Sequence, residues 1–303
     1  MPQTPRRILV AINPEASSGC NRDAGHAVVG ALSHARYDVT ALLEPNAGLL
    51  RIAIRNALPH SDALVVVGGD GMVSLAVNEL GDTGIPLGIV PTGSGNDTAR
   101  GLGIPIDDPA AATRMLLAAL DAPPRLIDVG LIRHAGSETR FAGVVSAGFD
   151  ALVNARADTW RRPRGKSKYT LALLCELASL ASHRFELTID GARMSVDAVL
   201  LSVANNVSLG GGMKIVPHAR LDDGVLDLFT VAPVGRLRLL RLFPKVFSGA
   251  HTELDVVSFR SLRSIRIDAP GMVAYADGER IGPLPIDVEV LPHALRVLAP
   301  ALI

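Results

Sequence analysis

Two glycine-rich turns contain the residues of this sequence that are best suited to hold phosphate groups. Gly68-Gly69-Asp70-Gly71 directly follows the apolar run 63–68, and the turn at 92–97, Thr-Gly-Ser-Gly-Asn-Asp, follows the apolar run 86–91. Glycine lets backbone N–H groups approach an anion, and the N-terminus of a following helix adds a favourable dipole. Neither turn is a Walker loop, because no Lys-Ser/Thr pair follows the glycines. An ordinary strand-to-helix turn is the competing interpretation.

The elements around these turns alternate between strand and helix through the first third of the chain. Apolar runs predict strands at 8–13, 37–43, 63–68 and 86–91, and helical stretches at 22–35, 48–58, 71–80, from about 96, and 109–120. This order predicts a parallel sheet with helices on both faces. Since open α/β sheets bind ligands at the carboxyl ends of their strands, the two turns are expected along one ligand-binding edge.

The pattern changes after Pro123-Pro124, and strands dominate the rest of the chain. We predict them at 125–131, 141–146, 185–190, 196–204, 225–231, 264–268 and 285–291, with helices at 168–182 and 236–247. The expected fold class is therefore α/β. Residues 1–124 form an N-terminal parallel α/β nucleotide-binding domain, and residues 125–292 form a C-terminal, β-rich antiparallel sandwich domain.

Composition excludes several classes of protein. Hydrophobic residues make up 48% of the 303 residues, enough for packed cores, and 30 basic residues balance 30 acidic ones, which argues against a nucleic-acid binder. Cys20 and Cys175 fit neither a zinc site nor a disulfide framework, so a reduced, cytoplasmic protein is expected. The apolar runs 8–12 and 171–181 are too short to span a bilayer. Any contact with a membrane would therefore be transient and at its surface.

Six motifs in this order resemble the diacylglycerol kinase catalytic-domain family, which includes sphingosine and ceramide kinases and bacterial lipid kinases. Besides the two turns, which run on to Arg100, they are Asn13-Pro14 with Ser18-Gly19, Gly148-Phe149-Asp150-Ala151, the segment 210–227 with Gly210-Gly211-Gly212 and Asp222-Asp223-Gly224, and Asp277-Gly278-Glu279. The resemblance covers nearly the whole chain. It departs at Met72, where the family has a threonine whose hydroxyl could touch phosphate.

The resemblance implies an ATP-dependent lipid kinase, with diacylglycerol as the first choice of acceptor and the active site in a cleft between two domains. Residues 293–303 would rejoin the first domain. The alternatives are a NAD kinase, which shares the Gly-Gly-Asp-Gly turn, and a non-catalytic lipid- or nucleotide-binding regulator. Phosphoryl transfer needs positioned phosphates, Mg²⁺ and a base near the acceptor hydroxyl.

The resemblance also implies a role for each motif residue. The ATP phosphates would be held by Asn13, Gly68, Gly69, Gly71, Thr92, Gly93, Ser94 and Arg100, with Asn96 contacting adenosine. Asp70 would act in catalysis and, with Asp97, organise Mg²⁺. Asp277 would be the general base, with Glu279 near the nucleotide or metal. Asp222 and Asp223 would hold a second, structural Mg²⁺, or form only a tight turn.

A basic run could bring the protein to a membrane. It comprises Arg156, Trp160, Arg161, Arg162, Arg164 and Lys166. Basic residues beside an aromatic one suit anionic lipid headgroups, although most runs of this kind are solvated loops. The sequence leaves the oligomeric state open, and a homodimer through an edge strand is compatible with this architecture.

Overall fold

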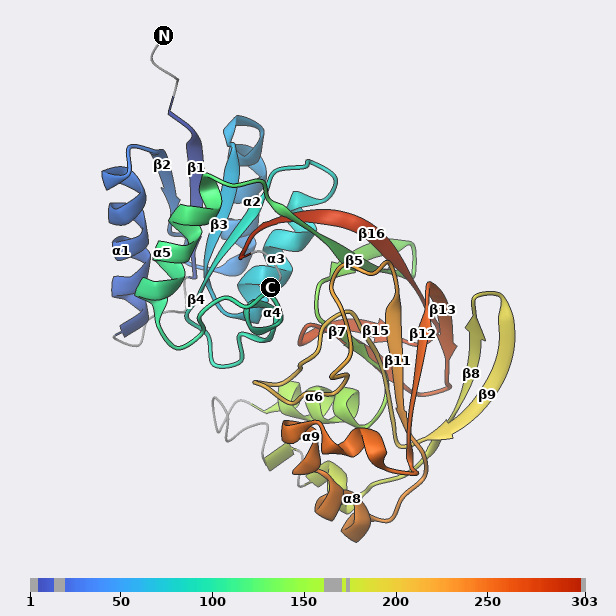
Figure 1. The fold of residues 1–303 in the computed structure, drawn as a ribbon. Helices are drawn as coiled ribbons and strands as arrows, with labels where there is room; N and C mark the ends of the chain where they lie inside the picture. Colours follow the sequence, from blue (N-terminus) through green and yellow to red (C-terminus); the bar gives the residue numbers. More distant parts are fainter. Residues whose placement is uncertain (1–4, 14–19, 161–170, 173–174, 301–303) are drawn as a thin grey trace. The chain divides into compact units, whose positions relative to one another are not determined.

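The computed structural model describes residues 5–13, 20–160, 171–172 and 175–300, and the chain divides into two compact units (Figure 1). Unit 1 comprises residues 1–127 and 293–303, and unit 2 comprises residues 128–292. Within the described part of the chain, no helix is long and apolar enough to cross a membrane.

Unit 1 is built on a parallel sheet in the strand order β2-β1-β3-β4. These strands are β1 (Arg7–Ile12), β2 (Asp38–Leu42), β3 (Ala63–Gly68) and β4 (Leu87–Pro91). The end of β16 (Ile286–Leu298) continues the sheet, because Val297 pairs in parallel with Leu87. Every residue of β3 and β4 is buried, which explains their unbroken apolar runs.

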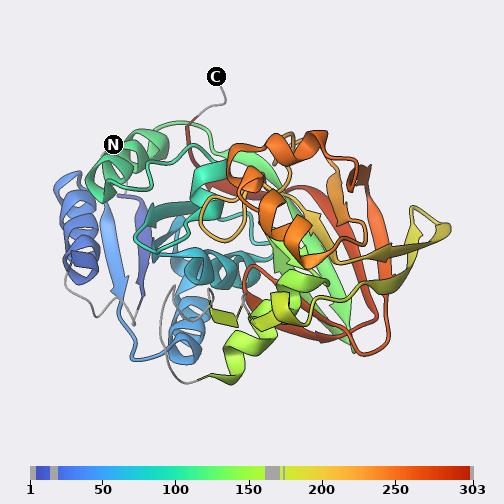
Figure 2. The ribbon, with the colours of Figure 1, turned by 90° about the horizontal axis from the view of Figure 1, so that it is seen from below.

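Helices cover both faces of this sheet. They are α1 (Cys20–His34), α2 (Ala47–Ala57), α3 (Asp70–Leu80), α4 (Asp97–Gly101) and α5 (Pro109–Leu120). Figure 2 shows α1 and α5 on one side of the strands and α2 and α3 on the other. Asn46 and Asp108 cap α2 and α5 by accepting backbone N–H hydrogen bonds. In contrast, α3 starts at Gly69 with no side-chain cap from any described residue.

Unit 2 contains two antiparallel sheets that share one core. The first has the order β12-β11-β10-β7-β14-β15, and its strands are β7 (Val144–Ser146), β10 (Leu200–Ala204), β11 (Leu226–Val231), β12 (Val257–Leu262), β14 (Val273–Ala276) and β15 (Glu279–Pro283). In the second, β16 is followed by β13 (Ser264–Asp268), β8 (His183–Ile189) and β9 (Ala192–Ala198), with the hairpin of β5 (Arg125–His134) and β6 (Ser137–Phe141) paired to β16.

The inner faces of the two sheets supply the core of unit 2. Val203 and Leu228 come from one sheet, Phe185 and Ile265 from the other, and all four are buried in one cluster. Helices α6 (Phe149–Thr159), α8 (Arg236–Leu242) and α9 (Lys245–Ser248) complete the unit. The predicted fold class is confirmed: a parallel α/β unit and an antiparallel β-sandwich.

Several elements differ from the sequence prediction. The single strand predicted at 196–204 is two strands in different sheets, β9 and β10, and the chain turns at Val199, whose N–H donates to the Val231 carbonyl. Helix α6 was not predicted, because its apolar and polar residues follow no clear helical period. Strands β12 and β15 were missed as well. They are the two edges of their sheet and expose half or more of their residues, so they lack an apolar run.

The helix predicted at 168–182 falls partly outside the described residues. Residues 171–172 and 175–178 are helical, and the helix ends before Ser179 rather than after it.

Candidate active site

The two glycine turns of unit 1 meet through their backbones. A methyl group added to Gly93 would lie 2.4 Å from Gly69 Cα, and one added to Gly69 would lie 2.9 Å from Gly93 Cα. The Thr92 N–H also donates to the Gly68 carbonyl at 2.9 Å. Only glycine allows this approach, so the turn after β3 and the turn after β4 form a single surface of main-chain groups.

Asn96 holds the second turn closed. Its Oδ1 accepts from the Gly93 N–H at 3.0 Å, and its Nδ2 donates to the Gly93 carbonyl at 2.9 Å. The residue is buried and has a positive φ of 55°, a conformation that asparagine tolerates better than most residues. Its amide therefore shapes the loop from within, while Gly93 and Ser94 are exposed and Thr92 is half-buried.

Two carboxyl groups lie beside this surface. Asp70 is the first residue of α3, and its Oδ1 accepts weakly from the Thr98 N–H at 3.4 Å. Burial raises the pKa of Asp70, and the charge of Asp97 raises it further. Arg100 approaches from the exposed side, with its Nε 3.9 Å from Asp97 Oδ1. Two crowded carboxyl groups of this kind favour a bound cation.

Asn13 and Met72 both lie close to the position that a side chain on Gly68 would occupy. The Asn13 N–H continues the sheet by donating to Val67 at 3.0 Å, and its Cβ would be 3.4 Å from a methyl on Gly68. Met72 is only 6% exposed, and its Cγ would be 2.4 Å from the same methyl. The side chain that replaces the family threonine therefore fills space over Gly68. Residues 14–19, including Ser18 and Gly19 of the opening motif, lie outside the described residues.

Asp277 lies in unit 2 at the tip of the β14–β15 hairpin. Asp277 and Gly278 have positive φ values of 48° and 84°, as a two-residue hairpin turn of type I′ requires. The carboxylate turns back and accepts N–H hydrogen bonds from Ala142 at 3.1 Å, Gly143 at 3.1 Å and Val144 at 2.9 Å. These three donors fix the orientation of the Asp277 carboxylate, while Glu279 at the start of β15 is exposed.

A buried polar group that the sequence analysis missed supports the segment bound by Asp277. The Asn205 N–H donates to the Gly143 carbonyl at 2.8 Å, and its Nδ2 donates to the carbonyls of Asp128 and Ala142 at 2.9 and 3.1 Å. Asp128 is fully buried and accepts from the Gly224 N–H at 2.7 Å. The sequence does contain a sign of this group, because the polar pair Asn205-Asn206 directly follows the apolar strand β10.

Asp222 and Asp223 lie in the turn before β11. Asp222 Oδ1 is 3.5 Å from the Nε of Arg220, and Asp223 Oδ1 accepts from the Val225 N–H at 3.2 Å. Burial raises the pKa of Asp223, and the charges of Asp227 and Asp128 add to this effect. The turn therefore concentrates negative charge near the end of unit 2's first sheet.

Asp150, from the Gly-Phe-Asp-Ala motif, lies at the start of α6 among apolar side chains. Its Oδ2 accepts from the Ser202 hydroxyl at 3.0 Å, and its Oδ1 is buried. Burial raises the pKa of Asp150, and the hydroxyls of Ser146 and Ser202 only partly oppose this. The motif thus joins α6 to strands β7 and β10.

No three His, Cys, Asp or Glu side chains gather as a metal site in the part of the chain that the structure describes. Proteins commonly bind Mg²⁺ through one or two carboxylates together with substrate phosphates. Asp70 and Asp97 are a donor set of this kind. Asp222 and Asp223 would need main-chain carbonyls to complete a site.

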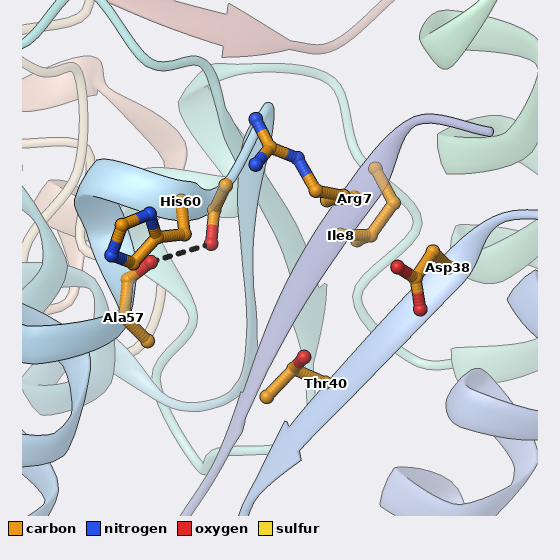
Figure 3. A pocket seen from close by; sticks show the side chains of 7 residues that line it. Arg7, Ile8, Asp38, Thr40, Ala57 and His60 are labelled. Carbon is orange, nitrogen blue, oxygen red and sulfur yellow. Dashed lines mark hydrogen bonds between the residues drawn. The ribbon is translucent and has the colours of Figure 1, made fainter. Parts of the chain in front are cut away.

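Two hollows in the described part of the structure lie away from these residues. One, of about 280 Å³, is lined by Arg7, Asp38, Thr40 and His60 (Figure 3). It lies where β1 and β2 begin, opposite the edge that carries the glycine turns, and Arg7 is already paired with Asp62 at 3.1 Å. A second, of about 610 Å³, lies over β13, β8 and β16 of unit 2 and is rich in paired charges such as Arg266 with Asp287. Neither contains a predicted site residue.

The basic run is only partly described. Arg156 pairs with Glu176, and Trp160 packs against the small apolar cluster of Phe149 and Val153. Residues 161–166, with Arg161, Arg162, Arg164 and Lys166, lie outside the described residues.

Comparison with known proteins identifies the family. The diacylglycerol kinase catalytic domain matches residues 7–132, and the YegS C-terminal NAD kinase beta sandwich-like domain matches residues 143–299. A diacylglycerol kinase of Mycobacterium tuberculosis is 39% identical over 97% of this chain and 95% of its own length. One of Bacillus subtilis is 25% identical, with 97% of each chain covered.

A solved structure shares the fold. The crystal structure of a diacylglycerol kinase from Bacillus anthracis superposes with a TM-score of 0.73 at 22% identity, covering 97% of both chains. The glycine turns, the paired carboxyls of unit 1 and the Asp-Gly-Glu hairpin of unit 2 thus occur in a chain whose two halves both match this family. The chain belongs to the diacylglycerol kinase catalytic-domain family and is a lipid kinase.

Proposed function

We propose that this lipid kinase transfers the γ-phosphate of ATP to a hydroxyl of diacylglycerol with the help of Mg²⁺. The observation that carries the proposal is the backbone contact between Gly69 and Gly93 beside Asp70 and Asp97. It provides main-chain groups for phosphates next to carboxyls for a cation. The acceptor is taken from the names of the relatives, which are diacylglycerol kinases.

Unit 1 would bind the nucleotide phosphates. The uncapped first turn of α3 offers N–H groups at Gly69, Asp70 and Gly71, and the Thr92–Ser94 turn adds more. Asn13 and Gly68 form the floor of this surface, and Arg100 supplies positive charge at its edge. These groups position the phosphoryl group, which is most of what phosphoryl transfer asks of a protein.

Asp70 and Asp97 would hold Mg²⁺. When bound, Mg²⁺ neutralises charge on the transferring phosphate. The raised pKa of Asp70 supports this role, because a carboxyl that is costly to ionise alone gains from a nearby cation. A second, structural Mg²⁺ at Asp222 and Asp223 is part of the same proposal, and the raised pKa of Asp223 agrees with it.

Asp277 would accept the proton of the lipid hydroxyl, with Glu279 near the nucleotide or metal. The three N–H donors from residues 142–144 support this role, since they hold the carboxylate in one orientation. A general base must be within hydrogen-bond reach of the hydroxyl, and a fixed base does not lose entropy as the reaction proceeds.

A transfer assay tests the proposal. Purified protein is incubated with Mg²⁺ and γ-labelled ATP and with diacylglycerol, ceramide, a sphingoid base or a polyprenol in mixed micelles, alongside NAD. We expect label in diacylglycerol, and none with Asp277→Ala. Label in another lipid would identify that lipid, rather than diacylglycerol, as the acceptor. Label in NAD would favour a NAD kinase, and ATP binding without transfer would favour a non-catalytic regulator.

Two further features belong to this proposal. The protein would act at the cytoplasmic membrane surface, reached in part through the basic run at 156–166. A homodimer is compatible with the exposed edge strands β12 and β15, and analytical ultracentrifugation would test for it.

A further inference from the structure

Helices α8 and α9 expose apolar side chains although they belong to a folded core. Leu237, Leu240 and Phe247 are 74%, 49% and 50% exposed. The two helices lie next to each other at one end of unit 2 (Figure 1). Single exposed apolar side chains are ordinary on a protein surface, but a contiguous apolar patch marks an interaction site.

The opposite sides of the same helices hold them to unit 2. Leu242 and Val246 pack against the cluster that contains Phe229 and Val231. In α8, Leu239 and Leu242 are half-buried on one side, and Leu237 and Leu240 point away from it, as the 100° step per residue requires. The exposed leucines are therefore not needed for the core.

Basic side chains flank the exposed apolar ones. On the helical wheel of α8, Arg236 and Arg241 lie on either side of Leu240 and Leu237, and Lys245 follows in α9. All three cations are exposed, and none pairs with an acidic side chain among the residues that the structure describes. From residue 232 to residue 252 the sequence has no Asp or Glu. We call the side chains of Arg236, Leu237, Leu240, Arg241, Lys245 and Phe247 the α8–α9 surface.

Helix α2 of unit 1 is a contrasting case within the same chain. Leu49 and Ile52 are 45% and 55% exposed, which is similar to Leu240 and Phe247. However, both of its arginines are paired with an acidic side chain: Glu79 lies 3.5 Å from Arg51 and 2.9 Å from Arg55. Exposed apolar residues thus occur on both helices, and only α8–α9 combines them with unpaired positive charge.

We propose that the α8–α9 surface docks the protein on an anionic lipid bilayer. The leucines and Phe247 enter the headgroup region, while the two arginines and Lys245 contact anionic headgroups, as an interfacial amphipathic helix does. The inference rests on the proposed function in one respect: a kinase whose acceptor is a membrane lipid must approach the bilayer that contains it. The α8–α9 surface shares no residue with the basic run at 156–166.

Vesicle binding of the full-length protein tests the inference. Co-sedimentation is measured with phosphatidylcholine vesicles, with and without phosphatidylglycerol, over a range of salt. Arg236→Gln with Arg241→Gln should weaken binding to anionic vesicles by roughly 30-fold and reduce its salt dependence, at about one kcal/mol per basic residue. Leu237→Ser with Leu240→Ser should weaken binding by roughly 10-fold at low and high salt alike.

A matched control comes from α2. Leu49→Ser with Ile52→Ser removes exposed apolar residues beside paired arginines, and should leave vesicle binding unchanged. Thermal unfolding should be the same in all these variants, since none of the substituted side chains is buried. Equal loss of binding in the α2 variant, or none in the α8 variants, would overturn the inference.

Two more measurements distinguish membrane docking from dimerisation and from failure of the proposed function. Sedimentation of the Leu237→Ser/Leu240→Ser protein tests a second copy as the occupant: dissociation of a dimer would overturn the lipid assignment. Transfer to a short-chain diacylglycerol dissolved without vesicles should be unchanged in the α8 variants. If no transfer occurs even in the unmodified protein, the proposed function fails, while α8-dependent vesicle binding would still support the docking surface.

Discussion

Unit 2 contains two Asp-Gly hairpin turns of the same construction, Asp190-Gly191 between β8 and β9 and Asp277-Gly278 between β14 and β15. Both aspartates have φ of 48°, and both glycines have φ of 84°. Both carboxylates also bind main-chain N–H groups of a distant segment. Asp190 Oδ1 accepts from Arg263 and Ser264 at 3.0 and 2.8 Å. A positive φ and N–H donors therefore do not by themselves mark a catalytic aspartate.

What differs is the segment that each carboxylate holds. Asp190 accepts hydrogen bonds from the start of β13, which is exposed. Asp277 accepts them from residues 142–144, a segment that Asn205 links to the buried Asp128. Burial alone would raise the pKa of Asp190, but the Ser264 and Arg263 donors outweigh it and the pKa is lowered. The comparison teaches that position, rather than local geometry, separates a structural turn from a candidate base. The predictions for carboxyl groups below use Asp190 as the reference.

The largest effect is expected from Asp277→Asn set against Asp190→Asn. Asp277 accepts through both oxygens, so its amide would place a donor opposite a backbone N–H, and Asp277→Asn should lose about 1–3 kcal/mol of unfolding free energy. Asp190 accepts through Oδ1 alone, which an asparagine can retain, so Asp190→Asn should lose less. Only Asp277→Asn should also lose kcat, by roughly 10²–10⁴-fold, which is the usual contribution of a general base. Chemical denaturation and the transfer assay measure the two effects. Equal kcat in the two variants would show that Asp277 is only a turn residue.

Asp70→Asn tests a carboxyl that accepts only a weak hydrogen bond from the Thr98 N–H and lies beside the charge of Asp97. Transfer should fall by at least about 10²-fold, because a cation site loses a charge. Stability without nucleotide and Mg²⁺ should rise rather than fall, since burial and Asp97 disfavour the charged form of Asp70. Thermal unfolding of the Asp70→Asn and Asp190→Asn proteins, measured side by side, checks that the two substitutions change stability in opposite directions. If Asp70→Asn were less stable than the unmodified protein, the Asp70 carboxylate would have a structural role, as that of Asp190 does.

Gly93→Ala tests the main-chain surface formed by the two glycine turns, whereas the preceding variants test carboxylates. The new methyl would lie 2.4 Å from Gly69 Cα and 2.8 Å from Asn96 Oδ1, so the two turns must separate. We expect transfer to drop by about 10²-fold, as a displacement near 1 Å can cause. Gly30→Ala in α1 is the control, since its methyl would meet nothing within 4 Å. Full activity of Gly93→Ala would mean that the contact between the turns is not needed.

The smallest effect concerns Asp150, whose pKa shift has the opposite sign to that of Asp190. Because burial raises the pKa of Asp150, the folded protein retains this proton to a higher pH than the unfolded chain does. Stability is therefore lost as pH rises from the ordinary aspartate pKa through the raised one. Asp150→Asn should be more stable than the unmodified protein at neutral pH, and the difference should vanish below the ordinary pKa. Denaturation midpoints of the two proteins over a pH series measure this difference in stability. A difference that does not change with pH would contradict a raised pKa for Asp150.

The sequence was sufficient for the parts of the site that depend on local order. Strand–turn–helix alternation placed the glycine turns after β3 and β4, and neighbouring parallel strands necessarily bring their ends together. The contact of Gly69 with Gly93 follows from that register, in which Gly68 pairs with Pro91. Met72 was identified as a departure, but only the packing shows that its side chain covers Gly68.

The parts that depend on distant segments could not be predicted from the sequence. The donors to Asp277 come from residues 142–144, more than a hundred positions earlier, and backbone N–H groups carry no sequence signal. Asn205 matters because it reaches two carbonyls at once, which requires the fold. Edge strands β12 and β15 were missed because half or more of their residues are exposed, which leaves no continuous apolar run.

The return of the chain to unit 1 at His293 has a consequence for biosynthesis. Strand β16 completes the sheet beside β4 with residues that leave the ribosome after the whole of unit 2. Until then the free side of β4, an apolar strand with unpaired main-chain groups, is open to other chains. The nascent protein would thus depend on chaperones for longer than one whose units follow each other in sequence. Substitutions near Val297 would then lower the yield of folded protein more than its final stability.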